Sequence, residues 1–343
     1  MAKVKLKIDF ETITPLWTGD AWMENSEIRP SSLIGSLRFW FEVICYFGGI
    51  CKKEEFDSDK GRFEKDIKND EIKKKFLDSG TDFNNQVQAL RELNVPIPAI
   101  VFGTTGWRSL IEIKGIQLLE DYCFGNKLNL PGKFCINKNN PNQIQEGNNC
   151  PVRSNNDYSV FYFKIPYFWG KFLVSFEVEQ NIKDAIFLPL LTFMDKYGYW
   201  GGGWNIGYGR LKVFSVEGES NGGKKEEFDF SCEGLNEKLN IHSIVETINV
   251  VNDLKNKTKI LITKSTSCEN YLNAIKGLIL KKANLRKIEN DQKERHYLFG
   301  KTGNIQGEDL PQGSKILPYI NKSNNNSYEC GLLSIAGILS LYD

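Results

Sequence analysis

The chain has 343 residues, of which 41% are hydrophobic and 12% aromatic, which is enough to build ordinary hydrophobic cores. This length suggests two domains. The formal net charge is only +1, which excludes a general electrostatic attraction to nucleic acid or to anionic lipid. Binding of nucleic acid would therefore need a local basic surface, or a channel shared with partner subunits.

The cysteines give no sign of a metal site. No CxxC pair occurs among the 8 cysteines, and only 2 histidines accompany them, so the pattern of a zinc site is missing. An even number is compatible with disulfides, but a long lysine-rich chain without a signal peptide favours a reducing cytosol and free, mostly buried thiols. Since no apolar run approaches about 18 residues, we expect a soluble, cytoplasmic protein with no membrane partner and no cofactor.

The first part of the chain predicts a strand, an irregular loop and an amphipathic helix. Polar and apolar residues alternate over 3–14, as in a half-buried strand. Beyond the loop, a helix is indicated by apolar residues at spacings of three and four: Leu33, Leu37, Trp40, Phe41 and Ile44. Ser31 and Ser32 are placed to cap its first turn.

Two arginines accompany this helix. Arg29 precedes it, and Arg38 lies among residues otherwise committed to a core. A buried cation is costly without a partner. Glu42, four residues after Arg38, supplies a structural partner. The functional alternative is an anionic ligand, such as a phosphodiester, held where the helix N-terminus attracts negative charge.

The remaining elements follow in an order typical of a ferredoxin-like fold with insertions. The patterns predict surface helices in 52–92, a turn and strand in 100–113, a loop or loose hairpin in 126–150, strands in 160–166 and 171–179, a helix in 184–197, a strand in 259–263 and a helix in 268–293. We expect an α+β protein with one domain over 1–218 and a smaller one over 219–343. VFGTTG at 101–106 and LFGKTG at 298–303 indicate a duplication.

Residues 198–209 form a glycine-rich loop before a further expected strand. Six glycines would let its backbone approach a ligand closely, and its aromatic residues, which include Tyr199 and Trp200, offer faces for stacked bases. The alternative is a tight crossover in which those aromatics pack. The candidate RNA contacts of this loop are Gly201, Gly202, Trp204, Gly207, Tyr208, Gly209 and Arg210.

Residues 255–301 are biased toward positive charge. Lys281, Lys282 and Arg286 on the expected helix could follow a sugar-phosphate backbone. A solubilising surface or a docking surface for an acidic partner explains them equally well. General acid–base chemistry has little support, because His242 and His296 are the only imidazoles and no carboxylate cluster suggests a two-metal site.

The segments TPLWTG (14–19) and IRPSSLIGSLRFWF (28–41) resemble the N-terminal motif of a protein family. The resemblance is to RAMP-superfamily proteins that form the first subunit of the Cmr complex, a type III-B CRISPR effector. It implies two tandem ferredoxin-like (RAMP/RRM-like) domains with helical and loop insertions. It also implies a non-catalytic RNA-binding role in antiviral defence, at the head of the complex, with guide RNA, target RNA and other Cmr subunits as partners.

The motif makes Arg29, Ser31 and Arg38 the first candidates for RNA contact. The family loop usually carries basic residues between its glycines, whereas this chain has WNI at 204–206. That departure favours stacking and backbone contacts over phosphate clamping. Two alternatives remain open: a metal-independent endoribonuclease of the same superfamily that processes guide RNA through His296 or His242, and a structural subunit that binds only proteins.

Overall fold

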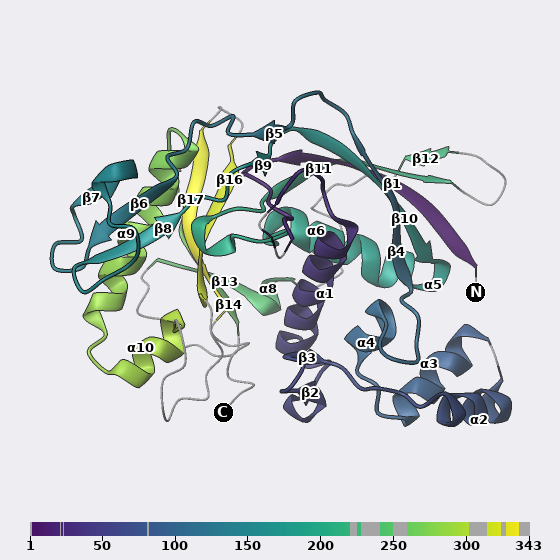
Figure 1. The fold of residues 1–343 in the computed structure, drawn as a ribbon. Coiled ribbons are helices and arrows are strands. Elements are labelled where there is room, and N and C mark those ends of the chain that lie inside the picture. The colour runs from purple at the N-terminus through teal and green to yellow at the C-terminus, as the bar shows by residue number, and fades with distance from the viewer. Residues whose placement is uncertain are drawn as a thin grey trace.

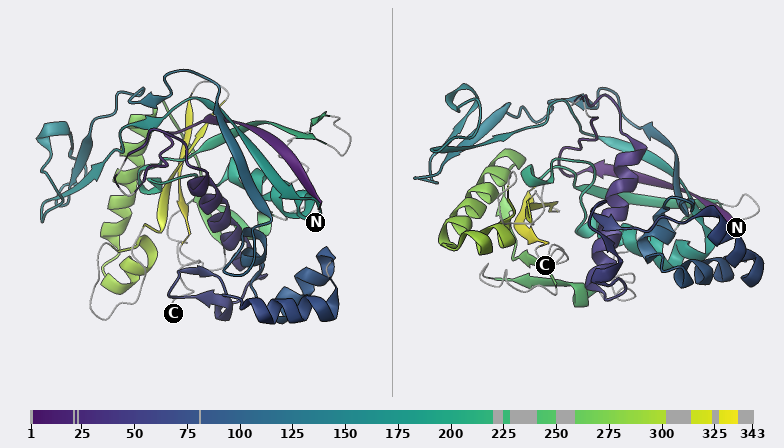
Figure 2. Two further views of the ribbon diagram at one scale, coloured as in Figure 1. Left: turned by 45° about the vertical axis from the view of Figure 1, so that its right-hand side comes forward. Right: turned by 60° about the horizontal axis from the view of Figure 1, so that its bottom comes forward.

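The computed structural model describes residues 2–20, 22, 24–80, 82–219, 225–227, 241–249, 259–301, 314–323 and 327–335. None of the helices within these ranges is long and apolar enough to cross a membrane. Both halves of the chain combine antiparallel strand pairs with covering helices (Figures 1 and 2). The protein is therefore of the α+β class, as the sequence predicts.

The first half is built around a five-stranded antiparallel sheet in the order β12-β11-β1-β10-β4. Its strands are β1 (Lys3–Thr12), β4 (Ile111–Leu118), β10 (Lys171–Glu179), β11 (Leu211–Glu219) and β12 (Lys225–Glu227). Helix α1 (Pro30–Phe47) follows β1, and α6 (Leu188–Lys196) lies between β10 and β11. Without β12, this is the β-α-β-β-α-β ferredoxin-like arrangement.

The alternation in β1 and the stripe on α1 explain how these elements pack. Leu6, Ile8 and Phe10 point to the same face of β1 and are buried, whereas Lys7 and Asp9 between them face away from the core. All five apolar residues of the predicted helix stripe are buried as well. The two periodicities thus place α1 on the inner face of the sheet.

Two insertions extend this first unit. The segment between α1 and β4 contains η1 (Lys53–Glu55), β2 (Phe56–Asp57), β3 (Arg62–Phe63), α2 (Asn69–Ser79), α3 (Phe83–Glu92) and α4 (Ile97–Phe102). The segment between β4 and β10 contains β5 (Phe124–Gly125), β6 (Lys133–Asn137), β7 (Ile144–Glu146), η2 (Gly147–Asn149), β8 (Tyr158–Tyr162) and β9 (Tyr167–Phe168). The predicted surface helices and the predicted hairpin are both confirmed.

The second half repeats part of the first. Its elements are α8 (Ile241–Ile244), β13 (Val245–Ile248), β14 (Ile260–Thr263), β15 (Thr266–Cys268), α9 (Tyr271–Ile288), α10 (Gln292–Phe299), β16 (Ile316–Lys322) and β17 (Tyr328–Ser334). Strand β17 lies between β14 and β16, as β10 lies between β1 and β4. Helix α9 follows β14 as α1 follows β1, so the two halves share a β-α-β-β order.

The repeated Phe-Gly sequence occupies equivalent places in the two halves. Helix α4 ends at Phe102 and α10 at Phe299, and each is followed by a glycine with φ of 85°, Gly103 and Gly300. A backbone with this positive φ favours glycine, because glycine has no Cβ. Because each helix precedes the corresponding sheet strand, β4 or β16, the structure supports the predicted duplication.

The two halves do not have separate cores. Alternate residues of β16 and β17 face opposite ways: Leu317 and Leu333 join the core of the first sheet, whereas Ile316 and Leu332 join a second core with α9. The second sheet is therefore buried on both faces. The predicted boundary between 218 and 219 stays a prediction.

The expectation of free thiols is wrong for four cysteines. Cys135 is bonded to Cys150 within the β5–β9 insertion, and Cys268 is bonded to Cys330 between β15 and β17. Neither pair is recognisable from spacing, because the strand pairing brings the partners together. Cys45, Cys51 and Cys123 are buried free thiols as predicted.

Candidate nucleic-acid interface

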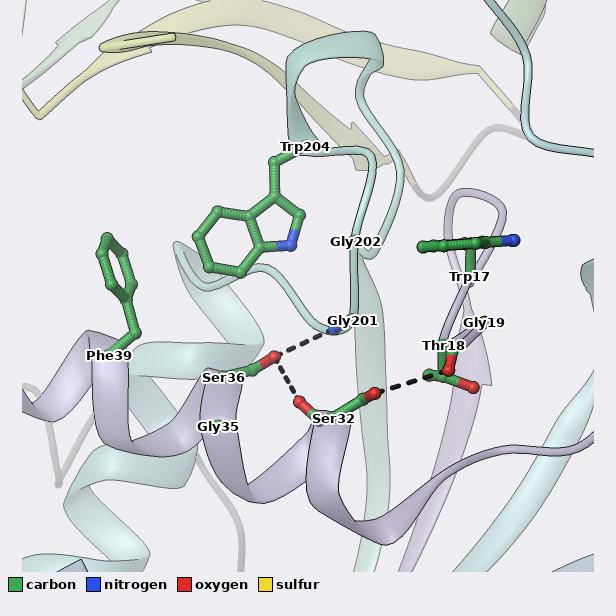
Figure 3. A pocket seen from close by; sticks show the side chains of 10 residues that line it. All are labelled: Trp17, Thr18, Gly19, Ser32, Gly35, Ser36, Phe39, Gly201, Gly202 and Trp204. Carbon is green, nitrogen blue, oxygen red and sulfur yellow. Dashed lines mark hydrogen bonds between the residues drawn. The ribbon is translucent and has the colours of Figure 1, made fainter. Parts of the chain in front are cut away.

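A cavity of about 340 Å³ forms where the two sequence motifs meet (Figure 3). It lies between the loop after β1, the N-terminal half of α1 and the glycine loop of residues 198–209. Its lining residues are Trp17, Thr18, Gly19, Ser32, Gly35, Ser36, Phe39, Gly201, Gly202 and Trp204. None of these ten residues is charged, so the cavity offers aromatic faces, hydroxyls and backbone groups.

Hydrogen bonds join the glycine loop to the helix and to the first motif. The Ser36 hydroxyl accepts from the Gly201 N–H at 2.9 Å and donates to the Ser32 carbonyl oxygen at 2.8 Å. The Gly202 N–H donates to the Trp17 carbonyl oxygen at 2.8 Å. These bonds hold the glycine loop against two segments near the start of the chain.

The glycines at this junction are required by close approach to Trp17. Gly201 has φ of 68°, and a Cβ there would collide with the Trp17 carbonyl oxygen. A Cβ on Gly202 would lie 3.0 Å from the Trp17 ring. Only glycine combines this φ with the absence of a side chain, so the loop passes directly beside the indole of Trp17.

Two tryptophans flank the Gly201–Gly202 segment (Figure 3). Trp204 packs on Phe39, with ring centroids 5.1 Å apart, and its buried indole N–H has no acceptor among the described residues. On the other side, the Lys164 ammonium lies 4.3 Å from the centroid of Trp17. Both indoles are half-buried, so each retains surface for a ligand.

Of the residues predicted in the glycine loop, only Gly201, Gly202 and Trp204 line this cavity. Tyr208 is fully buried, and its hydroxyl donates to the Lys164 carbonyl oxygen at 3.0 Å. Gly207 and Gly209 are buried too, with φ of 77° and 90°. Their prediction as RNA contacts is wrong for this fold, because the second half of the loop turns into the core. Tyr199 and Trp200 are likewise buried.

Arg210 is also a structural residue and not an RNA contact. Its side chain is fully buried, between the rings of Tyr199 and Tyr319. The guanidinium donates to the carbonyl oxygens of Met194, Asp195, Lys196, Gly198 and Ile320. Three of these belong to the last turn of α6 and Gly198 follows just after it, and the C-terminal end of a helix favours a cation.

Arg38 does not line the cavity, and its side chain points toward the insertion between α1 and β4. Its guanidinium bonds to the carboxylates of Glu42 and Glu64, both at 3.0 Å, and to the carbonyl oxygens of Phe63 and Gly103. The structural alternative is therefore correct for Arg38: it connects α1 to the end of β3 and to the end of α4, both in the insertion between α1 and β4.

Burial raises the pKa of Glu42 to about 7, against the lowering effect of Arg38. The folded protein therefore binds the carboxyl proton of Glu42 more tightly than the unfolded chain does. The stability that protonated Glu42 contributes is fully present below pH 4.5 and is lost as the pH rises through about 7. We expect the free energy of unfolding to fall between about pH 5 and about pH 8, and to fall less in Glu42→Gln. Denaturant titrations at several pH values would measure the free energy of unfolding, with Glu92→Gln as a surface control. An equal pH dependence in the two variants would contradict the role given to Glu42.

Arg29 and Ser31 lie at the start of α1. The helix begins at Pro30, two residues earlier than a cap at Ser31 would require, and Arg29 is the N-cap residue. Proline fits the first helical position because its missing N–H is not needed there; the predicted capping is therefore wrong. Ser31 is exposed, and Arg29 pairs with Asp20 at 3.0 Å. Whether either residue contacts RNA stays a prediction.

The predicted basic residues of α9 do not line the cavity, and they differ in how far they are buried. Lys281 is exposed. Lys282 donates to the Ser314 hydroxyl and the Ile316 carbonyl oxygen, and burial lowers its pKa to about 7. Burial also lowers the pKa of Arg286. Lys282 is therefore not the phosphate contact that was predicted, because its ammonium is committed to the second sheet.

Neither imidazole supports the nuclease alternative directly. His296 is buried in α10, with 7% of its surface exposed. The side chain of His242 lies outside what the structure describes. Within the described residues, no group of three histidine, cysteine or acidic side chains could hold a metal ion.

Sequence reasoning missed seven residues that line the cavity: Trp17, Thr18, Gly19, Ser32, Gly35, Ser36 and Phe39. A signal for three of them was present. Ser32, Gly35 and Ser36 are small residues at spacings of three and four on one face of an otherwise apolar helix, which indicates close approach of another segment. Phe39 continues that face.

The sequence model of the RAMP superfamily matches residues 9–212. The chain belongs to the RAMP superfamily. The matched region is more than half of the chain and includes the whole cavity. The comparison with curated proteins found no match.

Two solved structures are among those to which this RAMP chain is similar. Cmr1 from Pyrococcus furiosus, in its apo form, has 15% identity and a TM-score of 0.36, over 96% of this chain and 87% of the other. A Csm3-Csm4 subcomplex of a type III-A CRISPR-Cas interference complex has 14% identity and a TM-score of 0.31, over 69% and 95%.

Proposed function

We propose that this RAMP protein is an RNA-binding subunit of a type III CRISPR RNA-guided effector complex, without cleavage chemistry of its own. In its finer form, the proposal assigns the chain to the head of a type III-B Cmr complex. There it would hold the end of the guide RNA and engage the paired target RNA. Other RAMP subunits would be its protein partners.

The cavity at the junction of α1 and the glycine loop carries this proposal. It places two half-buried indoles beside a backbone segment whose glycines allow close approach. Since none of its lining residues is charged, it would bind nucleotides by stacking and neutral hydrogen bonds. Stacking is tolerant of base identity, which suits a subunit that leaves sequence recognition to base pairing.

Replacing Trp204 tests the stacking contribution. Trp204→Ala should weaken the binding of single-stranded RNA by about 1–3 kcal/mol and leave the salt dependence nearly unchanged, because no phosphate contact is lost. Fluorescence anisotropy at several salt concentrations would measure both, with melting temperatures to account for lost packing on Phe39. A lower melting temperature with unchanged RNA affinity would make Trp204 a core residue only.

The same samples test the nuclease alternative. RNA recovered from the binding reactions, with and without divalent metal, should be intact. Reproducible cleavage that disappears in His296→Ala would overturn the non-catalytic proposal and favour an endoribonuclease that processes guide RNA.

A further inference from the structure

The β6–β8 arm, residues 133–162, extends beside α9 (Figures 1 and 2). Its inner face carries Phe134 and Ile136, which pack into the core with α9. An ion pair between Lys276 of α9 and Glu146 of the arm holds the two together. One face of this three-stranded sheet is thus already occupied within the molecule.

The outer face of the arm is aromatic and partly exposed. The side chains of Tyr158, Val160 and Tyr162 alternate with the inward ones along β8 and therefore share this face. Tyr162 is 49% exposed, and Val152, which follows the disulfide-bonded Cys150 by two residues, is 81% exposed. Four residues of strand place the two tyrosines about 13 Å apart.

The arm and its base are also more basic than the chain as a whole. Residues 126–166 contain five basic side chains, Lys127, Lys133, Lys138, Arg153 and Lys164, and two acidic ones, Glu146 and Asp157. Lys276 neutralises the charge of Glu146, so the arm and its base together carry a local excess of positive charge. Aromatic faces interleaved with basic side chains are the combination by which proteins bind single-stranded nucleic acid.

The outer face of the arm continues from the cavity. Lys164 follows Tyr162 by two residues, and its ammonium lies over the ring of Trp17, a cavity wall. At the same place, the Asn25 amide donates to the Pro166 carbonyl oxygen at 3.2 Å. The loop of the first motif is thereby tied to the base of the arm.

We propose that single-stranded RNA leaving the cavity continues along the outer face of β8, with bases stacked on Tyr162 and Tyr158. This inference rests on the proposed function and names a second part of the RNA path. A protein partner on the same face is the competing occupant, which the experiment below separates from RNA.

RNA length provides the test. The wild type should bind an RNA of about 16 nucleotides more tightly than one of about 4. The double variant Tyr158→Leu/Tyr162→Leu keeps apolar contacts but loses the flat rings. It should bind the longer RNA at least about tenfold more weakly and the shorter RNA normally. Phe214→Ala, which removes a ring 57% exposed on β11, is the matched control and should change neither affinity.

A second measurement addresses the charge of the arm. Arg153→Gln should reduce the slope of log affinity against log salt by about 0.7 for the longer RNA only. Unchanged binding of the longer RNA by the tyrosine variant would overturn the inference and leave the face to a protein partner. Equal loss for both lengths would overturn it too, since the variant would then act through the cavity. Absence of RNA binding by the wild type would overturn the proposed function along with it.

Discussion

Replacing Gly35 with leucine is expected to abolish RNA binding in the cavity while leaving the protein at least as stable. Gly35 lines the cavity from α1, and a Cβ built on it would meet no atom within 4 Å. A leucine side chain would therefore extend into the space that we assign to RNA. Leucine is a better helix former than glycine, by somewhat less than about 1 kcal/mol. Affinity and stability should thus change in opposite directions.

Helix α9 offers a matched control for this substitution. Gly277 is also an exposed helical glycine whose Cβ would meet nothing within 4 Å, and it does not line the cavity. Gly277→Leu should give a similar gain in melting temperature with unchanged RNA affinity. A folded Gly35→Leu variant that binds RNA as the wild type does would show that RNA binds elsewhere.

Replacing Arg210 with methionine is expected to give the largest loss of stability. Methionine approximates the length of the side chain but donates no hydrogen bond, so up to five carbonyl oxygens would lose a partner in the core. Each unsatisfied buried group costs about 1–3 kcal/mol. A total loss of about 4 kcal/mol or more would be a large part of the usual stability of about 5–15 kcal/mol.

Thermal unfolding would measure this effect. A loss of that size should lower the melting temperature by about 10 °C. Arg108→Met is the control, because Arg108 is 74% exposed and pairs only at the surface with Glu112, where an ion pair contributes at most about 1 kcal/mol. An Arg210→Met protein that melts within about 2 °C of wild type would show that the carbonyls find other partners.

The ferredoxin-like order and the two halves of the cavity could be predicted because their signals are local. The alternation in β1 and the stripe on α1 repeat over a few residues, and each determines one buried face. The glycine loop is recognisable from composition alone. The TPLWTG and IRPSSLIGSLRFWF segments carry the family resemblance, and the superfamily match over residues 9–212 agrees with it.

The roles of the charged residues could not be predicted in the same way. Arg38 and Arg210 lie next to motif residues in the chain, and the sequence predicts RNA contacts for both. Besides Glu42, which the spacing suggests, Arg38 bonds to the carbonyl oxygens of Phe63 and Gly103, and Arg210 bonds to that of Ile320, which is 110 residues away. Sequence spacing contains no information about such carbonyl oxygens.

The sequence by itself determined which segments of this protein become strands, helices and close turns, because those preferences depend on residues a few positions apart. Only the tertiary structure decided which side of each segment remains open to a ligand and which side is buried. Gly201, Gly202 and Trp204 face a cavity, whereas Tyr208 and Arg210, a few residues later, face the core. The difference arises because the loop first passes beside Trp17 and then enters the space between the two halves of the chain. There, residues of the second half pack on the loop and bury it.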